Sequence, residues 1–64
     1  MFKKYRELRK ITQLELAELV DKDIRTIQRI ENEETVPTME TFKKLVLALK
    51  ISDKDILKYI KDNN

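Results

Sequence analysis

Apolar residues recur at helical spacing along the whole of this 64-residue chain. Leu16 and Val20 lie four residues apart, and Ile27 and Ile30 lie three apart. No segment alternates between apolar and polar residues as a half-buried strand would. Helical spacing places the apolar side chains of each segment on one face. The pattern therefore predicts an all-α fold.

Residues that cap helix amino termini divide this pattern into five expected helices. Thr12 followed by Glu15 forms a capping box, and the remaining caps are Asp23, Thr38 after Pro37, and Ser52. The expected helices span about residues 2–9, 12–20, 23–32, 38–49 and 52–61. Short connections of this kind are typical of a compact bundle. We expect one domain, residues 1–64, with fraying over residues 61–64.

The inward positions supply one small core, as a chain of this length requires. The expected core residues are Phe2, Tyr5, Ile11, Leu16, Ala17, Val20, Ile27, Ile30, Met39, Phe42, Leu45, Leu49, Ile51 and Ile56. The chain contains no Cys, His or Gly. These absences exclude a disulfide framework and a thiolate metal site, and they remove the commonest general base. We expect no catalytic residue, no metal and no cofactor.

Charge is unevenly distributed along the chain. Residues 1–13 carry a local charge of +4, residues 31–40 carry −4, and residues 41–64 carry +3. The net charge of +2 permits nucleic-acid binding but is weak evidence for it. Charge alone favours a solubilising surface. No signal peptide or membrane span fits the sequence, so we expect no membrane partner and a cytoplasmic location.

Residues 13–29 have the organisation of a helix-turn-helix. Two helices that cross at a steep angle need a small residue where they touch, and Ala17 provides one. The three-residue turn 21–23 follows, and the next helix turns Ile27 and Ile30 inward. Each element alone is ordinary, but their combined spacing is typical of this motif. Helical geometry then places Arg25, Gln28, Arg29 and Asn32 on the face opposite the core.

The sequence resembles the Cro/repressor-type (XRE) helix-turn-helix family through "LRKITQLELAEL" and "RTIQRIENEETVPTMETFKKLVLALKIS". The resemblance covers about residues 2–57. It implies a lambda-repressor-like domain of five helices, with a helix-turn-helix formed by the second and third. It further implies sequence-specific binding of double-stranded DNA, with the third helix in the major groove. The implied protein is a prokaryotic or phage transcriptional regulator, most often a repressor, or the N-terminal domain of one.

The resemblance also implies roles for individual residues. The base contacts would be Asp23, Ile24, Arg25, Gln28 and Arg29, and the phosphate contacts Thr12, Gln13, Thr26, Asn32, Thr38 and Lys43. Arg6 and Glu31 would form a structural salt bridge. Leu57, Tyr59 and Ile60 form a candidate surface for a homodimer on DNA.

Several residues depart from the family pattern. Lys10, Asp21 and Lys50 stand where the family has glycine, which costs about 1–2 kcal/mol at each left-handed position. Glu33 and Glu34 stand where many members approach a phosphate. The alternative function is therefore a protein-interaction module on the same scaffold with little DNA affinity. An enzyme, or a small-molecule substrate, is the least favoured hypothesis.

Overall fold

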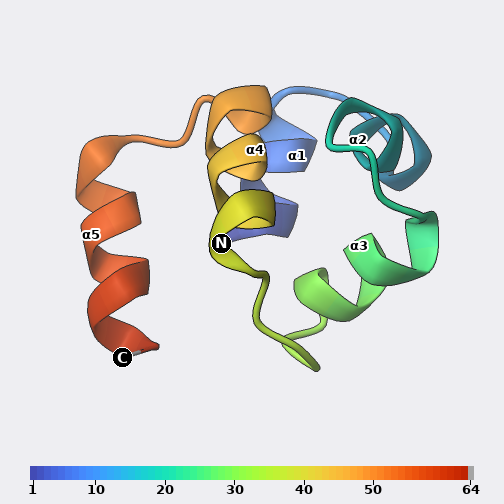
Figure 1. Ribbon diagram of the computed structural model, residues 1–64. Helices are drawn as coiled ribbons and strands as arrows, with labels where there is room; N and C mark the ends of the chain where they lie inside the picture. Colours follow the sequence, from blue (N-terminus) through green and yellow to red (C-terminus); the bar gives the residue numbers. More distant parts are fainter. Residues whose placement is uncertain (64) are drawn as a thin grey trace.

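The computed structural model describes residues 1–63, which form five α-helices and no strand (Figure 1). The helices are α1 (Phe2–Leu8), α2 (Gln13–Leu19), α3 (Ile24–Glu31), α4 (Met39–Leu49) and α5 (Asp53–Asp62). The predicted all-α fold is confirmed, and each helix end lies within one residue of its expected position. None of these helices is both long and apolar enough to cross a membrane.

Local side-chain hydrogen bonds explain where the helices begin. The hydroxyl of Thr12 accepts the N–H of Glu15 at 3.0 Å, and the Glu15 carboxylate accepts the N–H of Thr12 at 2.8 Å. This is the predicted capping box, which satisfies two backbone donors that the helix itself leaves free. The side chains of Asp23, Thr38 and Ser52 cap α3, α4 and α5 in the same way.

The core lies between α1, α2, α3 and α4. Its buried residues are Phe2, Tyr5, Leu16, Ala17, Val20, Ile27, Ile30, Phe42, Leu45, Leu49 and Ile51. Ile11 and Ile56, also expected in the core, are partly buried against it. The expectation for Met39 is wrong, because its side chain is 62% exposed. Met39 begins α4 and lies at the rim of a small hollow with Val36 and Ile60, beyond the neighbouring helices.

The last helix, α5, stands to one side of the molecule next to α4 (Figure 1). It has no buried residue of its own. Tyr59 attaches it to the core, with its ring stacked on Phe42 at 5.2 Å and edge-on to Phe2 at 5.2 Å. Near the start of α5, the Tyr5 hydroxyl donates a hydrogen bond to Asp55. The side chains of Tyr59 and Asp55 therefore attach α5 to the rest of the domain.

Two sequence expectations for α5 need correction. The ring of Tyr59, expected on a dimer surface, is half-buried in the aromatic cluster because Phe2 and Phe42 cover it. Residues 61 and 62, expected to fray, belong to the helix. Asn63 ends α5 with two bonds to the Tyr59 carbonyl, from its N–H at 3.1 Å and its side-chain amide at 2.9 Å. Asn64 lies outside the described residues.

Four residues hold left-handed backbone conformations that favour glycine. Lys10, Asp21 and Lys50 have φ angles of 59°, 57° and 53°. These are the three positions at which the family resemblance implies glycine. Glu33 is a fourth, with φ 61°. All four follow the end of a helix, where a left-handed residue helps satisfy the last carbonyl groups. These helices are therefore followed by a left-handed residue that is not glycine, although glycine adopts this conformation at the lowest free-energy cost.

Candidate nucleic-acid interface

The α2–turn–α3 unit has the short connection that the sequence predicted. Ala17 in α2 is 1% exposed, and Ile27 in α3 is equally buried. The N–H of Lys22 donates to the carbonyl of Ala17 at 2.9 Å, which ties the turn to α2. Asp21 adopts the left-handed conformation that lets the chain reverse here. The Lys22 side chain is exposed, so it does not plug the turn as an apolar residue would.

The outer side of α3 carries exposed polar side chains. Arg25, Gln28, Arg29 and Asn32 are all exposed, whereas Ile27 and Ile30 are buried. We call Arg25, Gln28 and Arg29 the recognition face. Within residues 1–63, the guanidinium groups of Arg25 and Arg29 form no hydrogen bond or ion pair. Ile24 begins the helix with its side chain 39% exposed.

Asp23, expected as a base contact, is engaged as the cap of α3. Its carboxylate accepts the N–H of Thr26 at 2.8 Å. The hydrogen bonds from Thr26 lower the pKa of Asp23, and the positive charges of Arg29 and Arg25 lower it further. The carboxylate is therefore held in its charged form at the start of the helix, where the helix dipole favours a negative charge.

A buried ion pair connects α1 to the end of α3. Arg6 Nε donates to Glu31 Oε2 at 2.6 Å, and Arg6 Nη2 donates to Glu31 Oε1 at 3.1 Å. The Glu31 side chain is only 2% exposed and that of Arg6 12%. The hydrogen bond and charge of Glu31 raise the pKa of Arg6 above its ordinary value. The ion pair expected between these two residues is present.

Two amide side chains extend this ion pair to the recognition face. Gln13 Nε2 donates to Glu31 Oε1 at 3.0 Å. Gln28 Nε2 in turn donates to Gln13 Oε1 at 3.4 Å. We call Arg6, Glu31, Gln13 and Gln28 the polar network. Sequence reasoning treated Gln13 only as a phosphate contact and missed this connection, although the place of Glu31 beside the inward Ile30 indicated that its carboxylate needs partners.

The other expected phosphate contacts have mixed surroundings. The hydroxyls of Thr12 and Thr38 are used as helix caps. The Asn32 amide donates to Glu34 at 3.5 Å. Thr26 is half-buried. Lys43 is exposed on α4, and in the described part of the chain no hydrogen bond links it to α2 or α3.

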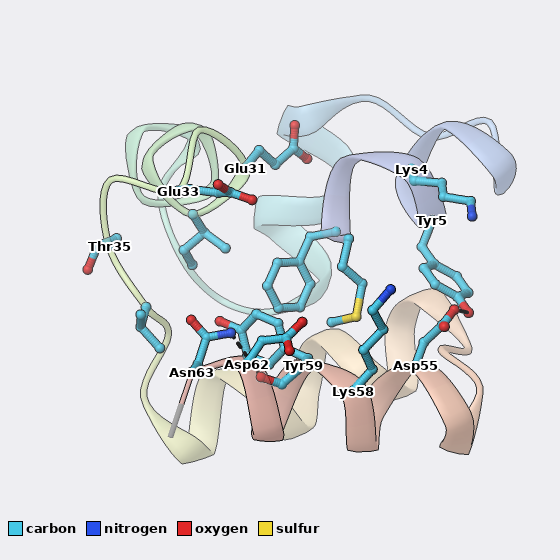
Figure 2. Close-up of a pocket in the computed structure, with 14 residues that line it drawn as sticks. Lys4, Tyr5, Glu31, Glu33, Thr35, Asp55, Lys58, Tyr59, Asp62 and Asn63 are labelled. Carbon is cyan, nitrogen blue, oxygen red and sulfur yellow. Dashed lines mark hydrogen bonds between the residues drawn. The ribbon is translucent and has the colours of Figure 1, made fainter.

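Glu33 lies beside a hollow of about 580 Å³ that also borders α1 and α5. Figure 2 shows Glu33 on one side of this hollow, with Lys58 and Tyr59 on the α5 side. Burial raises the pKa of Tyr59, and the negative charge of Glu33 raises it further. The negative charge of Glu33 therefore affects Tyr59, a residue of α5 that borders the same hollow.

A comparison with protein-family models matches residues 2–56 to the helix-turn-helix family HTH_3. Comparisons with curated proteins and with solved structures gave no significant match. The matched range contains the core, the α2–turn–α3 unit, the recognition face and the whole polar network. On this match, and with the geometry above, the chain belongs to the HTH_3 (XRE-type) family of DNA-binding helix-turn-helix regulators.

Proposed function

We propose that the protein binds specific sequences of double-stranded DNA with α3 in the major groove, as a transcriptional repressor of a prokaryote or phage. The observation that carries this proposal is the exposure of Arg25, Gln28 and Arg29 on one side of α3, opposite the buried Ile27 and Ile30. In a helix-turn-helix, this side of the second helix faces the base edges.

The chemistry of the recognition face suits base edges. Arg25 and Arg29 each offer a guanidinium that can donate two parallel hydrogen bonds to O6 and N7 of guanine. The Gln28 amide suits N6 and N7 of adenine, and Ile24 suits the methyl group of thymine. We assign the phosphate contacts that fix the register to Thr12, Gln13, Thr26, Asn32, Thr38 and Lys43.

Binding to duplex DNA as a function of salt tests the proposal. We expect affinity for duplex DNA to fall steeply between low and physiological salt, because phosphate contacts release counterions. Arg25→Ala and Arg29→Ala should each weaken binding, whereas Lys54→Ala, on the exposed surface of α5, should change it little. Failure of the wild-type chain to bind duplex DNA even at low salt would contradict the proposed function.

We further propose that two copies bind DNA together through α5 and the start of α4. Leu57 and Ile60 on α5 are 58% and 42% exposed, and Val36 and Met39, before and at the start of α4, are 59% and 62% exposed. Ile60, Val36 and Met39 border the same small hollow. A dimer that buries this apolar patch would read two half-sites, which requires its two α3 helices to lie about 34 Å apart, one turn of DNA.

Selection of bound sequences from a random duplex pool tests the dimer. We expect a site with two-fold symmetry. Leu57→Glu should weaken binding to the symmetric site far more than to a single half-site. Leu47→Glu is the matched control, because Leu47 is 78% exposed on α4 and lies outside the patch. A selected site without symmetry, together with equal effects of the two variants, would contradict the dimer.

The second candidate function is a protein-interaction module. Leu14 and Leu19 on α2 are 54% and 62% exposed, and Glu33 and Glu34 follow the recognition helix. These features favour a protein partner over a phosphate backbone. The salt experiment separates the two functions, because a protein-interaction module would show no duplex binding at low salt.

A further inference from the structure

Glu31 imposes a direction on the polar network. An ionised carboxylate has no donor, so every side chain that bonds to it must turn an N–H toward it. Arg6 supplies two such bonds and Gln13 supplies a third at 3.0 Å. Because the Glu31 side chain is only 2% exposed, water cannot easily replace these donors.

The direction set by Glu31 passes to Gln13. An isolated glutamine amide can point its nitrogen or its oxygen either way. With Nε2 turned toward Glu31, Oε1 of Gln13 must face outward, where it lies 3.4 Å from Gln28 Nε2. A reversed Gln13 amide would place an oxygen against the buried carboxylate, which is an unfavourable contact between two acceptors.

The outward oxygen of Gln13 selects in turn the orientation of Gln28. The Gln28 amide must present its nitrogen to Gln13, which uses one N–H. A second N–H and Oε1 of Gln28 remain, as one donor and one acceptor side by side. Adenine presents the matching pair in the major groove, an acceptor at N7 and a donor at N6.

We propose that Glu31 is a positioning residue for base recognition, which acts through Gln13 to hold the Gln28 amide in the orientation that selects adenine. This inference rests on the proposed function. Glu31 itself touches no DNA. Arg25 and Arg29 lie outside the network, so their guanine preferences do not depend on it.

Gln13→Met is the informative variant, because methionine has a similar length, forms no amide hydrogen bond, and leaves the Arg6–Glu31 ion pair in place. In a selection from random duplexes, Gln28→Met first identifies the base position that Gln28 recognises. At that position we expect Gln13→Met to reduce the preference for adenine about tenfold, the order that one good bidentate contact provides. Guanine preferences assigned to Arg25 and Arg29 should stay unchanged.

A measurement without DNA tests the same network. In NMR spectra of the free protein, the side-chain amide resonances of Gln28 should shift in Gln13→Met, and those of Gln13 should shift in Glu31→Gln. The exposed side-chain amide of Asn63, which donates to the Tyr59 carbonyl on α5, serves as control, and its resonances should not move. Unchanged Gln28 resonances in Gln13→Met would overturn the proposal whatever the protein binds.

The outcomes separate this inference from the proposed function. An adenine preference that Gln28→Met abolishes but Gln13→Met leaves intact would overturn the positioning role alone. If the wild-type chain bound no duplex DNA, the proposed function would be overturned, and so would the recognition of adenine by Gln28. Loss of the adenine preference in Gln13→Met, together with shifted Gln28 resonances, supports the proposal.

Discussion

Arg6 in α1 and Glu31 at the end of α3 are joined by two hydrogen bonds, the shorter of which spans 2.6 Å. The Glu31 side chain is almost completely buried. Arg6 also donates to the carbonyl of Ile11 at 3.0 Å, which ties the connection between α1 and α2 to the same guanidinium. This residue pair therefore joins the end of α3 to α1 and to the connection before α2.

Arg6→Ala should lower the free energy of unfolding by about 3–5 kcal/mol, because it leaves the Glu31 carboxylate buried without its main partner. Urea unfolding followed by circular dichroism measures the change. Lys44→Ala is the control, since Lys44 pairs with Glu40 at 3.5 Å on the surface and should contribute under about 0.5 kcal/mol. Unchanged stability with reduced DNA affinity would instead make Arg6 a DNA contact.

Lys50→Gly should stabilise the protein by about 0.5–1 kcal/mol. Lys50 has φ 53° and ψ 51°, a left-handed conformation that glycine adopts without steric cost. The gain in stability is smaller than the steric cost, because glycine also raises the conformational entropy of the unfolded chain. Lys54→Gly, inside α5, is the matched control and should destabilise by about 1 kcal/mol. Thermal unfolding of both variants measures the two effects. A shift of the melting temperature in the same direction in both variants would contradict a steric cost at Lys50.

Asp55 should make the stability of the protein depend on acid. The hydrogen bond from the Tyr5 hydroxyl lowers the pKa of Asp55, and the charge of Lys4 lowers it further. The contribution is therefore complete above about pH 4, the ordinary pKa of an aspartate, and is lost as the pH falls through the lower pKa of the folded state.

Unfolding curves between pH 5 and pH 2 measure this dependence. We expect Asp55→Asn to flatten it, and Tyr5→Phe, which removes the donor alone, to flatten it in part. Asp53→Asn is the control, because Asp53 lies two residues earlier on α5 and is exposed. An acid dependence that is equal in the wild type and in Asp55→Asn would rule out this carboxylate as its source.

Arg25→Lys should relax base specificity while keeping the salt dependence of DNA binding. Lysine retains the charge but lacks the planar pair of donors, so we expect a loss of about 1–3 kcal/mol in discrimination at one base position. Lys43→Ala should have the opposite pattern. The slope of the logarithm of the binding constant against the logarithm of the salt concentration should fall in magnitude by about one, and the base preference should stay unchanged. Competition binding at several salt concentrations measures both quantities. A reduced salt slope in Arg25→Lys would make Arg25 a phosphate contact.

The helices were predictable because their signals are local. Thr12, Asp23, Thr38 and Ser52 each bond to a backbone N–H three residues later, so sequence alone locates the helix starts. Met39 was wrongly expected in the core, since helical periodicity shows which face is apolar but not how far the neighbouring helices extend along it. The fourth left-handed position, Glu33, was missed although it follows the cap residue Asn32.

The polar network was only half predictable. The pairing of Arg6 with Glu31 followed from the family resemblance. The bonds from Gln13 and Gln28 depend on how closely α2 and α3 approach, a tertiary distance that residue types and spacing do not give. Burial of Tyr59 against Phe2 and Phe42 was missed for the same reason, because those rings come from three different helices.

The helix α5 adds no fully buried side chain, while α1 to α4 and Ile51 close the core. Substitutions on the outer side of α5 therefore leave the mutual packing of α2 and α3 unaltered. Under the proposed function, descendants of this sequence can therefore change how copies associate without changing which bases α3 contacts, and the reverse also holds. On that proposal, assembly and operator choice can evolve as separate traits even in so small a domain.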